Sequence, residues 1–213
     1  MRNRLTLLPQ ELLMTTNSVD HADWNYKPLL GLIQRKRFHM ILSLLGKKKH
    51  DHILEIGYGS GIFMPSLSTH CDKLTGIDIH PFNKEVSKIL ADYGLVADLF
   101  QGSVSQMPFP DESFDLVVSV SAFEFFEDKE AACKEIKRVL KKDGHFILVT
   151  PGESWILDLG FKILTKESAK HDFGDKRQHT IPILKEHFDV KESKLFPFVI
   201  GRLLPVYKAF SLE

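Results

Sequence analysis

The most informative run of the chain is Ile53-Leu54-Glu55-Ile56-Gly57-Tyr58-Gly59-Ser60-Gly61, an apolar segment that passes directly into three closely spaced glycines. Its first four residues have the composition of a buried strand. Because glycine has no Cβ atom, the turn that follows bends tightly and lets the backbone approach a ligand. The run therefore predicts a strand, a ligand-binding turn and then a helix.

The glycine spacing excludes two common nucleotide-binding loops. A dinucleotide fingerprint needs a glycine at position 62, where this chain has Ile62, and the acidic Glu55 precedes the turn. This counts against an NAD- or FAD-dependent oxidoreductase. A Walker loop is excluded more firmly, because no Gly-Lys-Ser/Thr follows. Taken alone, the run is also compatible with a tight turn that binds nothing.

An acidic residue follows the glycine turn at an informative distance. Asp78 ends the second predicted strand, roughly 20 residues after the turn, where a carboxylate accepts hydrogen bonds from the ribose hydroxyls of a nucleoside. By itself Asp78 also fits a helix cap ahead of Pro81. Together with the glycine turn it predicts an adenosine pocket.

Strand-like and helical segments alternate after residue 50, which is typical of βαβ units and a parallel sheet covered on both faces. The predicted strands are residues 53–56, 74–77, 96–100, 116–120, 145–149, 188–195 and 206–210. Apolar side chains recur at helical spacing at Val86, Ile89, Leu90 and Tyr93, and again at Ala132, Ile136, Val139 and Leu140 before Gly144, a predicted helix C-cap. We expect an α/β, Rossmann-like, doubly wound and mostly parallel seven-stranded sheet.

Two segments outside this pattern are expected to cover the carboxyl edge of the sheet, where open α/β folds bind ligands. Residues 1–50 form a predicted helical, substrate-side segment, with an amphipathic helix in its latter part. Residues 51–213 form the main domain, with a lid insertion at about 152–180. One domain with such additions is expected for 213 residues.

Bulk composition bounds the function class. The 28 Lys plus Arg balance the 28 Asp plus Glu, so the basic surface of a nucleic-acid-binding protein is not expected. The isolated Cys71 and Cys133 have no metal-site spacing, which predicts reduced core thiols, no metal and a cytoplasmic location. No signal peptide or membrane span is expected, and peripheral membrane contact stays open.

Four motifs in order resemble the class I S-adenosylmethionine-dependent methyltransferases, in particular the group of small-molecule enzymes related to the ubiquinone and menaquinone C-methyltransferases. The glycine run resembles the first motif of that family, and Gly76-Ile77-Asp78-Ile79 resembles the second. Residues 107–115 resemble the stretch before the fourth strand, and residues 135–144 resemble the helix and turn before the fifth.

The resemblance implies S-adenosyl-L-methionine as cofactor and assigns residues to it. Glu55 would face the methionine amino group, the glycines would give backbone access, and Asp78 would hold the ribose. The complete implied set is Glu55, Gly57, Tyr58, Gly59, Gly61, Asp78, Ile79, Gly102, Ser103, Val104, Ser119 and Ser121.

The sequence departs from this family in two places. Ser103 stands where relatives commonly place an aspartate that accepts from the adenine amino group, and a hydroxyl is the weaker acceptor. The run at residues 121–126 lacks the histidine that relatives often carry there. A catalytic base is therefore unassigned, with His171 and His179 as candidates.

Aromatic side chains are candidates for the acceptor side of the site, although ordinary core packing explains each of them equally. The candidates are Trp24, Tyr26, Phe123, Phe125 and Trp155. The many phenylalanines and the apolar run at residues 196–200 suit methyl transfer to a small apolar or lipid- and quinone-like molecule, and core packing explains them equally. The alternative is a non-catalytic regulatory module that binds S-adenosylmethionine on the same fold.

Overall fold

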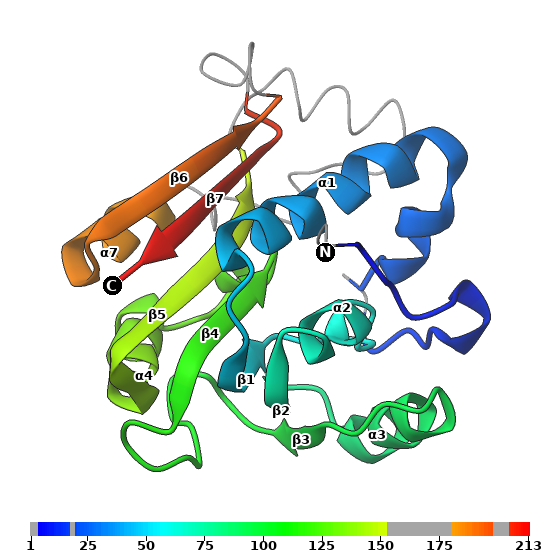
Figure 1. Cartoon of the computed structure of the whole chain (residues 1–213), viewed down its shortest axis with the longest axis horizontal. Helices are drawn as coiled ribbons and strands as arrows, with labels where there is room; N and C mark the ends of the chain where they lie inside the picture. Colours follow the sequence, from blue (N-terminus) through cyan, green and yellow to red (C-terminus); the bar gives the residue numbers. More distant parts are fainter. Residues whose placement is uncertain (1–3, 18–19, 153–179, 198–204) are drawn as a thin grey trace.

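The computed structural model of the chain describes residues 4–17, 20–152, 180–197 and 205–213. Its described part contains a seven-stranded sheet in the order β3-β2-β1-β4-β5-β7-β6 (Figure 1). The strands are β1 (His50–Ile56), β2 (Cys71–Asp78), β3 (Asp98–Gln101), β4 (Phe114–Val120), β5 (Leu140–Pro151), β6 (Val190–Phe196) and β7 (Tyr207–Leu212). Strand β7 runs antiparallel to both of its neighbours, and β1 to β5 pair in parallel. The expected mostly parallel, Rossmann-like sheet is confirmed.

Alternation along the central strands divides the core into two apolar layers. Ile53, Leu116 and Val118 belong to one cluster of buried residues. Their strand neighbours Leu54 and Val117 belong to the other. Because successive side chains of a strand point to opposite faces, a strand that is apolar at every position needs cover on both.

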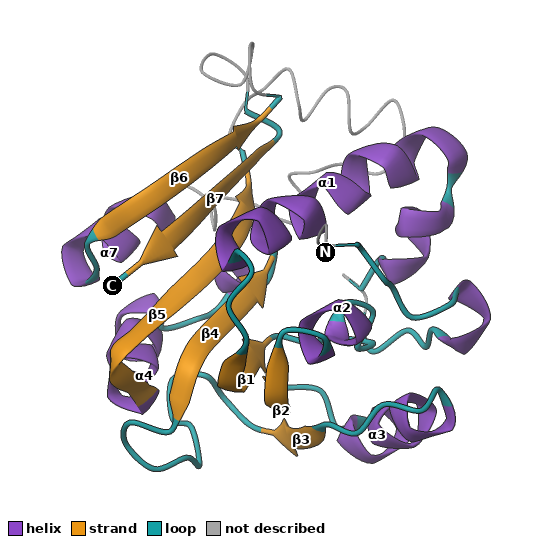
Figure 2. Cartoon of the chain, viewed as in Figure 1, coloured by secondary structure: helices purple, strands orange, loops and turns teal. Residues whose placement is uncertain are grey.

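Helices supply that cover on each face of the sheet (Figure 2). Residues of α1 (Pro28–Leu45), α2 (Met64–Ser68) and α3 (Asn83–Asp92) join the first cluster. Residues of α4 (Lys129–Val139) and α7 (Thr180–His187) join the second. The periodicities that predicted α1, α3 and α4 are confirmed, and so is a doubly wound arrangement.

The structure corrects the prediction around Gly144 and at the last helix. Helix α4 ends at Val139, because Leu140 already pairs with Phe114 of β4. The pairing then shifts, and Leu116 lies opposite His145. Gly144 is therefore an irregular position within β5 and not a helix C-cap. The strand predicted at residues 188–195 starts two residues later, because β6 begins at Val190. The helix α7 that precedes it was not predicted.

The chain order reverses between β1 and β4, which pair side by side in the middle of the sheet. Connections from their carboxyl ends lead to opposite faces, and open α/β sheets bind ligands in the crevice that results.

Cys71 and Cys133 are buried free thiols. Within the described residues, no helix has the length and apolar character needed to cross a membrane.

Candidate cofactor and acceptor site

A cavity of about 810 Å³ lies at the carboxyl edge of the sheet. Its wall includes the turn after β1, the end of β2, the residues after β3 and the end of β4. Helix α1, residues before it, residues 121–122 and 125–128 after β4, the end of β5 and the start of β7 complete the described wall. The volume lies within the range of small-molecule and cofactor sites.

The three glycines of the turn have separate reasons to lack a side chain. All three have positive φ angles, of 71° at Gly57, 52° at Gly59 and 74° at Gly61. A Cβ atom on Gly57 would lie 2.4 Å from Cβ of Ala122, so this residue lets β1 and β4 meet closely. At Gly59 the nearest atoms are those of the Asp20 carboxylate, at 3.7–3.8 Å, and both residues line the cavity. Gly61 does not line the cavity.

Asp78 ties the end of β2 to the glycine turn. Its Oδ2 atom accepts a hydrogen bond from the Gly59 N–H at 2.8 Å, and its Oδ1 atom accepts from the His80 N–H at 3.3 Å. A carboxylate has about four acceptor positions, so capacity for further donors remains. Ile79 is 75% exposed and lines the cavity beside Asp78.

Glu55 is a buried acid with an unsatisfied oxygen. Its side chain lines the cavity, and its Oε2 atom has no hydrogen-bond partner in the part of the chain that the structure describes. Burial, and next the negative charge of Asp78, raises the pKa of Glu55 to about 8. The hydroxyl oxygens of Ser60 and Ser121 also line the cavity without a described partner. Buried polar atoms are rarely left without a hydrogen-bond partner, so we expect these oxygens to bind polar groups of a ligand.

Arg37 is the site residue that sequence reasoning missed. Of the described residues on the cavity wall it is the only lysine or arginine, and its Nε atom is buried without a described hydrogen-bond partner. Nothing in the sequence distinguishes it from Arg35 and Lys36 beside it. Only the packing of α1 over the carboxyl edge shows which cation faces the cavity.

The charge of the cavity wall is mainly negative. Among the described wall residues, Arg37 stands against the carboxylates of Asp20, Asp78, Glu127 and Asp128, and Glu55 adds an acid with a raised pKa. Such a wall complements a cationic ligand better than one with several phosphates. No group of three or more potential metal ligands occurs in the described ranges.

Gly102, Ser103 and Val104 follow β3 and line the cavity beside Ile79. The Ser103 hydroxyl already accepts a hydrogen bond from the Ser105 N–H at 3.2 Å, as in a local turn. Because Oγ keeps a second acceptor position, this contact does not occupy it fully.

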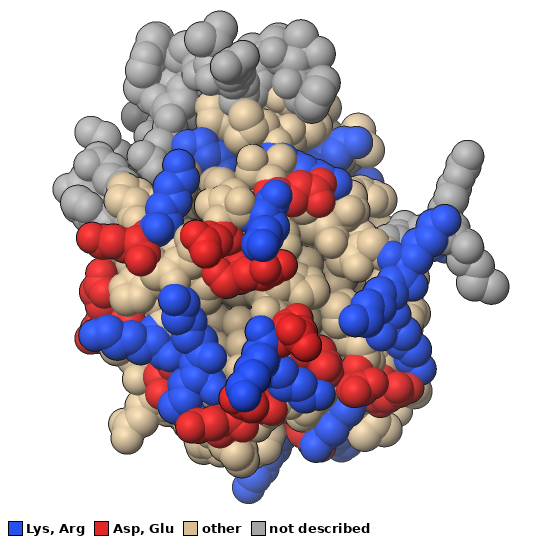
Figure 3. Space-filling view, turned by 60° about the vertical axis from the view of Figure 1, so that its left-hand side comes forward, with Lys and Arg blue, Asp and Glu red and all other residues tan. Residues whose placement is uncertain are grey.

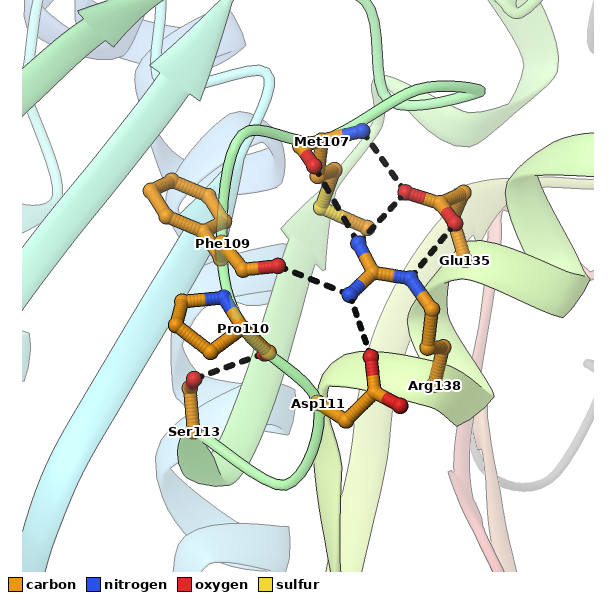
Figure 4. Close-up of polar contacts among 7 residues, drawn as sticks. All are labelled: Met107, Phe109, Pro110, Asp111, Ser113, Glu135 and Arg138. Atoms are coloured by element: carbon orange, nitrogen blue, oxygen red, sulfur yellow. Dashed lines mark hydrogen bonds and ion pairs between the residues drawn. The ribbon is translucent and has the colours of Figure 1, made fainter.

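A charged network fixes the chain just after this turn (Figure 4). Glu135 of α4 accepts a hydrogen bond from the Met107 N–H at 2.7 Å. Arg138 donates to the carbonyls of Met107 and Phe109, at 3.1 and 2.7 Å, and pairs with Asp111 at 2.8 Å. The two sequence motifs around residues 107–115 and 135–144 are therefore parts of one structural contact.

The remaining expected residues divide between the cavity wall and the core. Trp24 and Phe125 line the cavity, whereas Tyr26 donates its hydroxyl to the Leu8 carbonyl and does not. Phe123 is fully buried against Phe126 and Phe146, so its expected place on the acceptor wall is corrected to the core. Tyr58, Val104 and Ser121 line the cavity, and Ser119 is buried outside its wall. Trp155, His171 and His179 lie outside the described residues.

The surface of the molecule is mixed in charge on the face shown in Figure 3. Basic and acidic side chains are interspersed there, with no extended area of one sign.

Comparison with known proteins finds similarity to methyltransferases. Residues 54–148 match a family model described as a methyltransferase domain. The uncharacterized methyltransferase YcgJ of Bacillus subtilis (strain 168) is 35% identical over 104 residues, which are 48% of this chain and 41% of the relative. The phosphatidylethanolamine N-methyltransferase of Cereibacter sphaeroides is 33% identical over 100 residues, 46% of this chain and 49% of the relative.

A solved structure extends the likeness over the whole fold. The N-methyltransferase NodS of Bradyrhizobium japonicum WM9, in complex with S-adenosyl-L-homocysteine, has a TM-score of 0.66 to this chain. It is 20% identical, and the alignment covers 95% of this chain and 96% of NodS. The chain thus spans less than half of the length of the two curated relatives, while its fold spans nearly all of NodS. Residues 54–148 are therefore similar to a methyltransferase domain, and the chain has the fold of NodS.

Proposed function

We propose that this protein transfers the methyl group of S-adenosylmethionine to a small, apolar acceptor. The observation that carries the proposal is that an acidic and a basic side chain, each with a buried polar atom that has no described partner, lie on the same cavity wall. Glu55 has a buried oxygen without a described partner, and Arg37 is the only lysine or arginine among the described wall residues. The methionine part of the cofactor carries an ammonium and a carboxylate, which suit Glu55 and Arg37 respectively.

The adenosine part of the cofactor has a matching set of residues. Asp78 would accept from the ribose hydroxyls with the acceptor positions that Gly59 and His80 leave open. Gly102, Ser103 and Val104 would lie along the adenine, with Ile79 against it. When bound, the cofactor supplies an activated methyl group on a sulfonium centre. The cationic sulfonium also suits the mainly acidic wall.

The acceptor side of the cavity is built mostly from apolar side chains. These are Trp24, Leu30, Ile33, Phe125, Phe126 and Val206. The polar pair on this side satisfies itself, because the Tyr207 hydroxyl donates to Oε1 of Gln34 at 3.0 Å. Burial raises the pKa of Tyr207, which keeps the phenol neutral and able to donate. Such a wall selects by shape and apolar contact, so a lipid- or quinone-like molecule fits it.

Several earlier expectations belong to this proposal. Residues 1–50 serve as the substrate-side segment, because Trp24 and α1 contribute to the wall. The proposal also includes kinship to the ubiquinone and menaquinone methyltransferases and a cytoplasmic location. It keeps Trp155 as a residue of the acceptor side, and His171 and His179 as candidates for a catalytic base. The protein's main contribution to rate would be alignment of the two reactants and exclusion of water.

The proposal is tested with cofactor that carries a tritiated methyl group, incubated with the protein and with a total lipid and quinone extract. We expect label to enter the organic phase in proportion to protein, and Glu55→Gln to reduce it. Label that enters only the water-soluble fraction of a whole-cell extract would contradict an apolar acceptor. Tight binding of S-adenosylhomocysteine without transfer to any fraction would favour a non-catalytic regulatory module.

A further inference from the structure

We propose that His80 is a positioning residue for cofactor binding, acting through Gly59. The inference rests on the proposed cofactor site and adds a residue to it. His80 follows the ribose acid by two positions, and its side chain is only 2% exposed. It does not line the cavity, so any effect on a ligand must pass through the residues that it holds.

The hydrogen bonds of the imidazole define its orientation and tautomer. Its Nδ1 atom accepts from the Phe82 N–H at 3.1 Å, which places the ring proton on Nε2. Nε2 then donates to the Gly59 carbonyl at 3.0 Å. The ring also packs edge-on against Tyr58, with centroids 5.0 Å apart.

Together, Asp78 and His80 hold both polar groups of Gly59. The N–H is bound by the Asp78 carboxylate and the carbonyl by the imidazole. Gly59 has a φ of 52° and lines the cavity, in a turn that glycine can leave for other conformations at little cost. The clamp fixes this peptide relative to the ribose acid, so the turn and Asp78 meet the cofactor in one prearranged geometry.

A purely structural role for His80 makes a different prediction. The contact from Phe82 to Nδ1 precedes α3, and its loss would destabilise the fold without a specific effect on the ligand. The two ring nitrogens therefore separate the two roles. In His80→Gln, the amide nitrogen reaches the position of Nε2 and keeps the donor to Gly59. In His80→Asn, the side-chain oxygen reaches the position of Nδ1 and keeps the acceptor for Phe82.

The experiment compares both variants with the wild type by calorimetric titration with S-adenosylhomocysteine, alongside urea unfolding without ligand. We expect His80→Gln to bind within roughly threefold of the wild type and His80→Asn to bind about tenfold more weakly, the scale of one hydrogen bond. Stability should follow the opposite order. Wild-type affinity in His80→Asn, or equal losses of affinity in both variants, would overturn the proposal.

A second measurement needs no variant and no ligand. The ¹⁵N chemical shifts of the imidazole report which ring nitrogen carries the proton, and we expect the proton on Nε2 of His80. A proton on Nδ1 would overturn the clamp. Failure of the wild type to bind S-adenosylhomocysteine would instead reject the proposed cofactor site, so the two failures are distinguishable.

Discussion

The cofactor side and the acceptor side of the cavity differ in whether their polar atoms have hydrogen-bond partners. On the side of the β1 turn, Glu55, Ser60 and Ser121 carry buried oxygens that no described group satisfies. On the other side, Tyr207 and Gln34 satisfy each other within an apolar wall. Unmatched polar atoms specify the chemistry of a ligand, whereas a self-satisfied wall constrains mainly its shape. The structure therefore constrains the chemistry of the proposed cofactor more sharply than that of the acceptor.

The largest expected effect comes from a methyl group on Gly59. In Gly59→Ala the new Cβ atom has room, since nothing lies closer than 3.7 Å, but it enters space on the cavity wall. We expect affinity for S-adenosylhomocysteine to fall about 100-fold, or about 2.7 kcal/mol, by calorimetry. The cost to stability should be only that of a left-handed alanine, about 1 kcal/mol.

Gly94→Ala is the matched control for this variant. Gly94 has a φ of 88° with open space around a Cβ atom, and it lies outside the cavity wall. It should lose similar stability with unchanged affinity. Equal affinities in the two variants would mean that the turn does not contact the ligand.

Arg37→Met should weaken binding of S-adenosylhomocysteine about 10- to 100-fold, because a hydrogen bond to a charged group is lost. The sharper comparison uses 5′-methylthioadenosine, which lacks the methionine ammonium and carboxylate. Its affinity should be unchanged in the variant. If both ligands lose equally, Arg37 supports the cavity wall and does not bind the carboxylate.

Glu55 gives the cofactor side a distinctive dependence on pH. Its ordinary pKa of 4.5 is raised to about 8 in the folded protein, so the folded state retains a proton that the unfolded state has lost. The stability of the ligand-free protein is therefore full below about pH 4.5 and is lost as the pH rises towards 8. Replacing Glu55 by Gln removes this loss.

We expect Glu55→Gln to gain roughly 1–2 kcal/mol over the wild type between pH 5 and pH 8 in urea unfolding. Binding of the methionine ammonium should ionise Glu55, so the wild type should release a proton near pH 7. Calorimetry in buffers of different ionisation enthalpy measures that proton. A stability difference independent of pH would show that Glu55 is already ionised in the folded protein.

The smallest expected effect concerns the adenine end. Ser103→Asp should tighten binding of S-adenosylhomocysteine by a few-fold, roughly 0.5–1 kcal/mol, because a carboxylate accepts the amino hydrogen bond more strongly. The control ligand is the analogue that lacks the adenine amino group, which should not gain. An equal gain for both ligands would place Ser103 away from the amino group.

The residues proposed for the cofactor can be recognised in the sequence because local chemistry determines them. The glycine turn, Asp78 and the stretch around Met107 each combine a backbone requirement with a short spacing, so they are visible without a structure. Arg37 and His80 carry no such mark, because their roles depend on where α1 and the end of β2 pack.

The residues of the acceptor side are harder to recognise from the sequence, for a related physical reason. An aromatic side chain packs equally well in a core or on a cavity wall. Phe123 is buried in the core, whereas Phe125, two residues later, lines the cavity. Only the turn at η3 (Phe123–Phe125) decides which ring faces the cavity. The irregular pairing that places Gly144 inside β5 is likewise a contact between distant segments.

The most direct test of the central claim is a calorimetric titration of the wild-type protein with S-adenosylhomocysteine, repeated with NAD⁺. We predict one S-adenosylhomocysteine site per chain, weaker binding in Arg37→Met, and no detectable binding of NAD⁺. A dissociation constant of about 1 mM corresponds to a standard free energy of binding of only about −4 kcal/mol. Absence of S-adenosylhomocysteine binding up to roughly that concentration would contradict the claim. So would equal affinity for the two nucleotides.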